Sequence, residues 1–365
     1  MTQISKYEMF ALLALYQLGT TVIFGFASES GRDAWLASGL SAVLGACLVL
    51  VYLFIFKATG GLTLVEWFPW VFGKWFGTPL AWLFPLLFIY NAARIISDVR
   101  FLFPVTILNR TPDWIIGITF LGVVVYALLG GVEVVARLAG FFLPLVYISL
   151  LLEIILLAAS NTFHFANLLP VAGEGWGRIL KTVWPLGLMQ TYGESIEFAV
   201  IWGYVREKKG LALWAAGGTL LAGFSIALMD LLVVSGMGEA VFQQMMYPAF
   251  ALLKLSNINY LDNLDAIGII YLVVNAFIKM SMHLFTAAVC LRDLTGGKSE
   301  KPMIVVASAM ALFISLTMVI SFTEHLEVAK KVIPYNVWVP MFLALPGIVL
   351  LALPVKKWIM GVKSS

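Results

Sequence analysis

The feature that most constrains this chain is the recurrence of long apolar stretches from one end to the other. Each has about 18 residues or more, which is enough for a helix to cross a hydrocarbon core of ~30 Å. Hydrophobic residues make up 61% of the chain and charged residues 12%, whereas about a quarter of a typical soluble domain is charged. Since backbone groups in lipid must be hydrogen-bonded within their own segment, the sequence predicts an all-α membrane protein.

We predict ten transmembrane helices in a single integral membrane domain that covers 1–365. In chain order the spans are 7–29, 34–57, 78–105, 113–132, 138–159, 182–205, 211–236, 265–290, 303–322 and 336–355. The first five and the last five form two halves, 7–159 and 182–355. Basic residues are concentrated in the short loops "REKKG" and "RDLTGGKSEK", so the positive-inside rule favours a cytoplasmic location for both termini.

The rest of the composition argues against several classes of protein. Cys47 and Cys290 fall within predicted spans, so neither a disulfide framework nor a metal cluster is indicated. The histidines His164, His283 and His325 are scattered and lack zinc-binding spacing. The sequence has neither a P-loop nor a dinucleotide-binding glycine fingerprint, and its net charge of +3 gives no indication of nucleic-acid binding. We therefore expect no enzyme, no cofactor, no metal and no nucleic-acid partner.

Three connecting segments are longer than the others. Residues 60–77, "GGLTLVEWFPWVFGKWFG", combine tryptophans with a lysine, which predicts a helix in the membrane interface on the cytoplasmic side. Segments 160–181 and 237–264 are predicted to face outward. Because they are too apolar for flexible linkers, we expect them to cap the bundle.

Glycine lies near the centre of the first span in each half. Gly19 is followed by Thr20 and Thr21 in the first span, and Gly193 lies in the sixth. The two halves are predicted to run in opposite directions, and matched glycine interruptions in such halves are typical of an inverted-repeat transporter core. This predicts a 5+5 inverted repeat whose broken helices expose backbone groups at mid-membrane. The alternative is that these glycines only allow close helix packing.

Polar residues form a stripe on one face of each of three predicted spans. The stripes are Asn91, Arg94 and Asp98 in the third span, Gln190, Glu194 and Glu197 in the sixth, and Asn275, Lys279 and His283 in the eighth. A charge at the centre of a membrane helix costs ~2.5–3.5 kcal/mol on insertion scales. These stripes must therefore face the interior of the bundle, where partners or water are available.

The sequence limits which residues could form ion pairs with the charged residues of these stripes. Arg94 and Asp98 could neutralise each other on one helix. Lys279 has no acid on its own span, and Glu194 and Glu197 are the candidates to pair with it.

The remaining buried titratable residues are expected to be structural. Glu153 and Asp230 are single acids, and we expect each to make a helix–helix hydrogen bond. A lone buried histidine such as His283 is more often a core residue with a hydrogen-bond partner than a proton relay.

Several motifs occur in order along the ten predicted spans. They are "SGRDAWLA", "LTLVEWFPWVFGKWFG", "GGVEVVARLAGFFLPL", "NLLPVAGEGWGRILK" and "YGESIEFAVIWGYV". With them the chain resembles, over nearly its entire length, the B subunit of bacterial spore germinant receptors. These are the GerAB-type spore germination proteins of the amino acid–polyamine–organocation superfamily.

This resemblance implies a ten-span core similar to the leucine-transporter fold. It also implies a nutrient sensor in the spore inner membrane that binds a small germinant, such as an amino acid or a sugar. The partners would be a larger A subunit and a lipoprotein C subunit. By the superfamily pattern the ligand would contact "LGTT" and "TYGE", with the third, eighth and tenth spans completing the pocket. The first span departs from typical permeases, which have a denser glycine motif there.

The stripes and the resemblance together define a candidate ligand site. Its residues are Gly19, Thr20, Thr21, Asn91, Arg94, Asp98, Tyr192, Gly193, Glu194, Lys279 and His283. Two other functions remain open. One is a proton-coupled secondary transporter for amino acids or amines, in which Glu194, Lys279 or His283 carries the proton. The other is a scaffold that recruits receptor partners without binding a solute.

Overall fold

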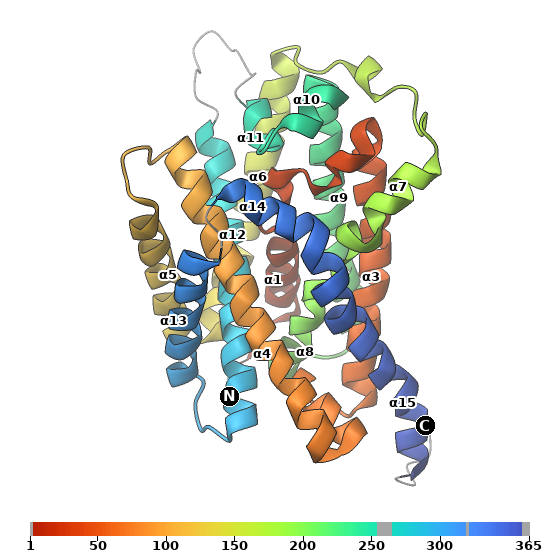
Figure 1. Cartoon of the computed structure of the whole chain (residues 1–365), viewed down its shortest axis with the longest axis vertical. Coiled ribbons are helices and arrows are strands. Elements are labelled where there is room, and N and C mark those ends of the chain that lie inside the picture. Colours follow the sequence, from red (N-terminus) through yellow and green to blue (C-terminus); the bar gives the residue numbers. More distant parts are fainter. Residues whose placement is uncertain (1–2, 254–264, 319–320, 360–365) are drawn as a thin grey trace.

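A computed structural model describes residues 3–253, 265–318 and 321–359, and it is a bundle of helices (Figure 1). Six helical segments among these residues are long and apolar enough to cross a membrane: Phe26–Ala58, Leu64–Thr106, Val132–Ala159, Leu211–Met237, Gly268–Thr295 and Pro334–Trp358. Two shorter apolar helices are α5 (Asp113–Leu129) and α13 (Lys301–Thr317). The prediction of an all-α membrane protein is therefore confirmed.

Six further helices overlap predicted spans, most of them closely. They are α3 (Ala34–Ala58), α4 (Leu64–Thr106), α6 (Val132–Ala159), α9 (Leu211–Met237), α12 (Asp265–Thr295) and α15 (Leu345–Ile359). Before α15 the chain forms two π-helical segments, η6 (Val328–Val332) and η7 (Pro334–Ala344). Two residues of the predicted span 303–322, 319 and 320, lie outside the described residues.

The first predicted span is interrupted. Helix α1 (Lys6–Leu18) begins with a capping box between Ser5 and Glu8, and it ends at Gly19, which has φ 42° and ψ −135°. A short α2 (Thr21–Phe24) and a 3-10 segment, η1 (Phe26–Asp33), follow. Because a positive φ is readily adopted only by glycine, Gly19 fixes the position of this break. The predicted break near Gly19 is confirmed.

The sixth predicted span is also interrupted. Helix α7 (Trp176–Thr182) leads into it, a π-helical turn, η3 (Val183–Gly187), follows, and residues 190–192 form a turn. The chain continues as η4 (Gly193–Glu197), α8 (Phe198–Ile201) and η5 (Trp202–Tyr204). The predicted break is therefore present and lies immediately before Gly193.

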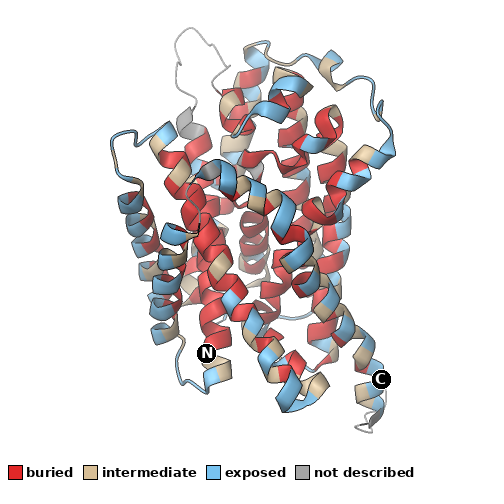
Figure 2. Ribbon diagram, in the orientation of Figure 1, coloured by how far each residue is buried: buried red, intermediate tan, exposed pale blue. Residues whose placement is uncertain are grey.

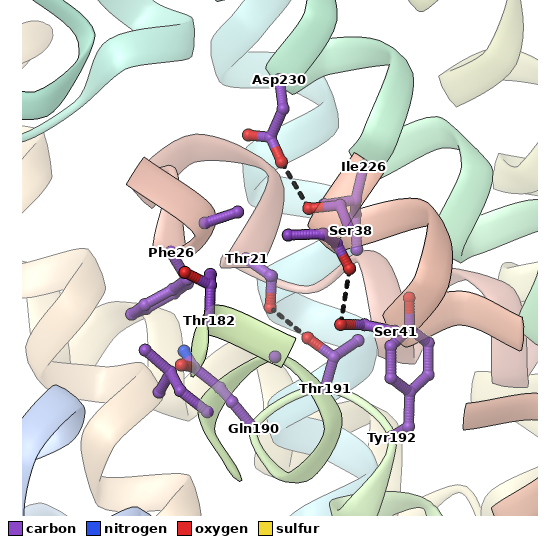
Figure 3. A pocket seen from close by; sticks show the side chains of 14 residues that line it. Thr21, Phe26, Ser38, Ser41, Thr182, Gln190, Thr191, Tyr192, Ile226 and Asp230 are labelled. Carbon is purple, nitrogen blue, oxygen red and sulfur yellow. Dashed lines mark hydrogen bonds between the residues drawn. The ribbon is translucent and has the colours of Figure 1, made fainter. Parts of the chain in front are cut away.

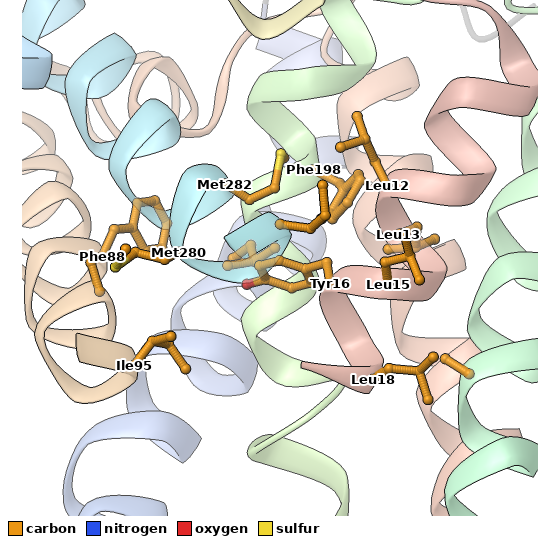
Figure 4. Packing of buried hydrophobic residues seen from close by; sticks show 14 of the residues in the cluster. Leu12, Leu13, Leu15, Tyr16, Leu18, Phe88, Ile95, Phe198, Met280 and Met282 are labelled. Carbon is orange, nitrogen blue, oxygen red and sulfur yellow. The ribbon is translucent and has the colours of Figure 1, made fainter. Parts of the chain in front are cut away.

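Helix α1 occupies the interior of the bundle, in contact with α6, α9 and α12 (Figure 1). The interior is buried throughout (Figure 2), and in α1 Met9 and every residue from Ala11 to Leu18 are buried. Figure 4 shows Leu12, Leu13 and Leu15 of α1 in the same cluster as Phe198 and Met280. Lipid is as apolar as leucine, so van der Waals packing of this kind holds the broken helix in place.

The predicted helix over 60–77 is part of α4 and is set off by Gly73, which has φ 78° and ψ 165°. The chain folds back tightly after this point: a Cβ atom at Gly77 would lie 2.3 Å from the carbonyl carbon of Phe68. Trp67 is buried, whereas Trp75 is 93% exposed. The location of this segment in the membrane interface stays a prediction.

Short helices cover the end of the bundle opposite the described termini (Figure 1). They are η2 (Phe165–Leu168), α10 (Glu239–Gln244), α11 (Pro248–Leu253) and α14 (Phe322–Glu327). The outward segment predicted over 237–264 lies beyond the described residues after Leu253.

Glu239 connects three of the segments at this end. Its carboxylate accepts hydrogen bonds from Arg32 of η1 and Arg178 of α7, both at 2.8 Å. Burial raises the pKa of Glu239, but the two arginines outweigh this effect, so the pKa is lowered from its usual 4.5.

At the other end, the N-terminal segment is joined to the end of the sixth span. Ile4 and Val205 form an isolated parallel β-bridge. The Ile4 amide donates to the Tyr204 carbonyl, and the Arg206 amide donates to the Ile4 carbonyl, both at 3.0 Å. These backbone bonds hold the start of α1 against the end of η5.

Candidate ligand-binding site

The two helix breaks meet at a small cavity, which we call the charged cavity. It is lined by Thr20, Thr21, Phe26, Asn91, Arg94, Ile95, Asp98, Gln190, Glu194 and Lys279. These residues come from both breaks, from α4 and from α12. About 20 Å³ of it is open to the centre of a water molecule, which is room for roughly one or two waters.

Lys279 and Glu194 form an ion pair in this cavity. The Lys279 Nζ atom lies 2.8 Å from Glu194 Oε2, and each side chain is 4% exposed. The contact lacks good hydrogen-bond geometry, so its attraction is mainly electrostatic. A Cβ atom at Gly19 would lie 2.5 Å from Lys279 Cδ, which means that glycine makes room for the lysine stem. The prediction that Lys279 pairs with an acid of the sixth span is confirmed.

Asp98 is held by residues far from it in the sequence. Thr20 Oγ1 donates to Asp98 Oδ2 at 2.8 Å, and His325 Nε2 of α14 lies 3.0 Å from Asp98 Oδ1. The suggested pair between Arg94 and Asp98 is wrong. The Arg94 guanidinium instead lies 5.1 Å from the ring centroid of Trp338 in η7. The break in the first span brings the Thr20 hydroxyl to Asp98, and Arg94 turns to the indole face.

Several polar atoms around the charged cavity have no hydrogen-bond partner among the described residues. They are both amide atoms of Asn91, Nε of Arg94 and Oε1 of Gln190. Each of these side chains is at least nine-tenths buried. Buried polar atoms are nearly always hydrogen-bonded in folded proteins. Unpaired donors and acceptors around one cavity are therefore suited to the polar atoms of a small ligand.

His283 lies behind the charged cavity and does not line it. Its Nδ1 atom is 2.5 Å from Glu197 Oε1, and Thr286 Oγ1 donates to Glu197 Oε2 at 2.9 Å. Both His283 and Glu197 are fully buried. His283 therefore has the partner expected of a core histidine.

Tyr192 and Gly193 also lie away from the charged cavity. A Cβ atom at Gly193 would lie 2.8 Å from Phe342 Cδ2 of η7, so this glycine allows the sixth span to pack against the tenth. The Tyr52 hydroxyl of α3 is 3.3 Å from the Gly193 carbonyl and donates to the Phe342 carbonyl at 2.5 Å.

Tyr192 lines a second cavity, which we call the hydroxyl cavity (Figure 3). This cavity lies between α3, α9 and the two breaks, and it shares Thr21, Phe26 and Gln190 with the charged cavity. Its one charged residue is Asp230, whose Oδ2 atom accepts a hydrogen bond from Ser38 at 2.5 Å. The expected helix–helix hydrogen bond of Asp230 is confirmed.

With this geometry established, comparison with known proteins identifies the family. The sequence model of the family described as "Spore germination protein" matches residues 3–323. The chain belongs to this family.

Relatives cover most of the chain at low identity. The chain is 25% identical to spore germination protein KB of Bacillus subtilis (strain 168) over 349 residues, which is 94% of this chain and 92% of the relative. It is 23% identical to spore germination protein A2 of the same organism, over 78% of this chain and 77% of the relative.

Solved structures share the fold of this family member. One is a nucleobase-cation-symport-1 family transporter in a closed conformation with bromovinylhydantoin bound. It has a TM-score of 0.70 at 10% identity, and the match covers 96% of this chain and 78% of the transporter chain. A Na⁺-coupled sialic acid symporter in a substrate-bound, outward-open state has a TM-score of 0.56 at 12% identity. The match covers 98% of this chain and 90% of the symporter chain. At such identities the likeness establishes the fold alone, and that fold is the predicted leucine-transporter type.

Sequence reasoning missed two residues that contact the charged cavity's lining and two that line the hydroxyl cavity. Trp338 and His325 gave no signal, because each contacts the site from a segment distant in sequence. Ser38 and Ser41 lie three residues apart in the second span, and this helical spacing is a signal that could have placed them on one buried face.

Proposed function

We propose that this chain is the germinant-sensing membrane subunit of a spore germinant receptor, and that the charged cavity binds the germinant. Membership of the spore germination protein family supports the biological role. The observation that carries the ligand site is a buried cavity between two helix breaks, lined by four charged side chains and by unpaired polar atoms.

The charges around this cavity favour a zwitterion, most simply an α-amino acid. Arg94 and Lys279 carry positive charge, Asp98 and Glu194 carry negative charge, and all four are at most 8% exposed. Their sum is zero, so a ligand with one carboxylate and one ammonium group leaves the cavity neutral. Buried charges are stabilised only when they are paired. The carboxylate would contact Arg94, and the ammonium group would contact Glu194.

Ligand binding would require the walls of the cavity to move. An amino acid needs more space than the roughly one or two waters for which this cavity has room. The two breaks provide short segments that can rearrange without unfolding a long helix. A ligand that fits only the rearranged form would shift the population towards it, which is how a receptor converts binding into a signal.

We further propose the finer features of the topology and assembly. The chain would cross the bilayer of the spore inner membrane ten times, with inverted repeats over about 7–159 and 182–355 and both termini in the cytoplasm. Figure 1 supports an even number of crossings, since the described ends, Gln3 and Ile359, lie at the same end of the bundle. A membrane A subunit and a lipoprotein C subunit would complete the receptor.

The ligand site can be tested on the full chain purified into lipid nanodiscs. Its midpoint of thermal unfolding is measured with each compound of a panel of amino acids and sugars. We expect at least one amino acid to raise the midpoint saturably, and Arg94→Gln to remove that rise. Arg110→Gln, at an exposed position, is the matched control and should keep it. A panel without any active compound, or a full response in Arg94→Gln, would refute the proposal.

The second candidate function is a proton-coupled secondary transporter for amino acids or amines. Two buried acid–base pairs on neighbouring turns of α12, Lys279 with Glu194 and His283 with Glu197, favour it. Proteoliposomes with an imposed pH gradient separate the candidates, because a transporter accumulates the compound and a sensor only binds it. A scaffold would do neither.

A further inference from the structure

The Asp230 carboxylate differs from the other acids of the two cavities because it has no counter-charge. Asp230 lies on α9 and is 5% exposed. Among the residues that the structure describes, Ser38 is its one hydrogen-bond partner, and no Lys, Arg or His is within 4 Å of the carboxylate. A buried carboxylate without a positive partner is strongly unfavourable unless a proton or another cation joins it.

The hydroxyl groups around Asp230 present acceptors rather than donors. Ser41 Oγ donates to the Ala37 carbonyl at 2.8 Å, and Thr182 Oγ1 donates to the Arg178 carbonyl at 3.3 Å. Ser38 has already donated to Asp230.

At the two breaks, Thr191 Oγ1 donates to Thr21 Oγ1 at 3.4 Å, and the Thr21 hydroxyl is free to rotate its own proton away from the cavity. A hydroxyl that has donated its proton keeps oxygen lone pairs for an electropositive group. Figure 3 shows these side chains converging on one cavity from α3, α9 and both breaks. The hydroxyl cavity is therefore built to attract a positive charge and to repel an anion.

The size and charge of the cavity identify the class of cation. About 30 Å³ is open to the centre of a water molecule, which is room for roughly two or three waters. Hard cations prefer carboxylate, hydroxyl and carbonyl oxygens. Calcium sites usually supply several carboxylates, whereas this cavity supplies one negative charge, which a single monovalent ion balances.

We propose that the hydroxyl cavity binds one monovalent metal cation of the size of Na⁺ or K⁺, with Asp230 as the charged ligand and Ser38, Ser41, Thr21 and Thr191 as hydroxyl ligands. The site adjoins the germinant site, but it needs no germinant. The ion would connect the two helix breaks, because its ligands include one threonine from each. Since Thr21 also lines the charged cavity, the ion would fix one wall of the germinant site.

The test uses the purified full chain in detergent, without any germinant. Thermal unfolding is followed in a series of NaCl or KCl concentrations, with choline chloride added to keep ionic strength and chloride constant. We expect one of the two metal ions to raise the unfolding midpoint saturably, by roughly 2–4 °C for each tenfold rise in concentration above the dissociation constant. Asp230→Asn should abolish the shift, and Ser41→Ala should move it to higher ion concentrations.

Glu153→Gln is the matched control. Glu153 is also a fully buried acid of a spanning helix, but it does not line the hydroxyl cavity, so this variant should keep the full shift. Identical midpoints in choline, sodium and potassium would overturn the proposal, as would a full shift in Asp230→Asn. If Asp230→Asn does not fold, the salt series of the wild-type protein and of Ser41→Ala still shows whether the cavity binds a metal cation. A failed germinant screen would leave this ion response unaffected, so the two proposals fail separately.

Discussion

Glu194 and Asp230 are both buried acids beside the break in the sixth span, but their electrostatic surroundings are opposite. Glu194 is paired with Lys279 in a cavity whose charges sum to zero. Asp230 faces a ring of hydroxyl oxygens and has no positive partner in the described part of the chain. One side of the break therefore suits a neutral or zwitterionic molecule, and the other suits a cation. The contrast is accessible to mutation because the two acids share no partner.

The largest effect is expected at the paired acid. Lys279→Met leaves Glu194 buried and unpaired, which should lower the free energy of unfolding by about 3–5 kcal/mol. Denaturant titration of the protein in detergent measures this loss. Adding Glu194→Gln removes the uncompensated charge and should recover part of it. Lys298→Met, at an exposed loop position, is the control; equally mild effects at both lysines would contradict the ion pair.

A smaller effect is expected at Asp98, which holds the first break. Asp98→Asn weakens charge-assisted bonds from Thr20 and His325, and should cost about 1.5–3 kcal/mol. Thr20→Val removes one of these bonds and should cost less, about 1 kcal/mol. The same titration gives both values. A larger loss in Thr20→Val than in Asp98→Asn would show that Thr20 acts through packing rather than through Asp98.

The unpaired acid should be nearly neutral to mutation. In choline buffer, where a proton takes the place of the metal ion on the carboxylate, Asp230→Asn should change the free energy of unfolding by less than about 1 kcal/mol, because the amide oxygen can still accept from Ser38 and no opposite charge is left alone. Glu194→Gln in the same buffer should cost several times more, since it strands Lys279. Equal losses would mean that Asp230 has a positive partner after all.

The smallest effect belongs to the ion-pair network around Glu239, outside both cavities. The pKa of Glu239 is lowered in the folded protein, so its contribution is present above about pH 4.5 and is lost as the pH falls through the lowered pKa. Glu239→Gln should remove this pH dependence and cost below about 1 kcal/mol at neutral pH. Unfolding midpoints between pH 3 and pH 7 test it. Glu174→Gln, which removes a more exposed partner of Arg178, should change the profile less.

Features set by a single segment could be predicted from the sequence. The length of α3 follows from its apolar run, and the break in the first span follows from Gly19. The need of Lys279 for an acid on another helix follows from the absence of one on its own. In each case a local property, such as span length, allowed φ or unpaired charge, limits the outcome to one or two possibilities.

Features made by several segments could not be predicted. The hydroxyl of Thr20 reaches Asp98 only because the first span breaks and places it against α4. Tyr192 lies two residues before Glu194 in the motif "TYGE", yet it lines the other cavity, because the turn over 190–192 rotates the chain. The hydroxyl cavity collects residues from four separate segments, and no spacing in the sequence relates them.

The bridge between Ile4 and Val205 has a consequence for how the chain can evolve. Both of its hydrogen bonds use main-chain atoms, and the Ile4 side chain is 1% exposed, so other apolar residues at position 4 preserve them. Proline is the exception, because it lacks the amide hydrogen that Ile4 donates to Tyr204. Related sequences can therefore exchange this residue among apolar types while the start of α1 stays joined to the end of the sixth span. An alignment of such sequences would show an apolar position whose identity varies although the architecture is constant.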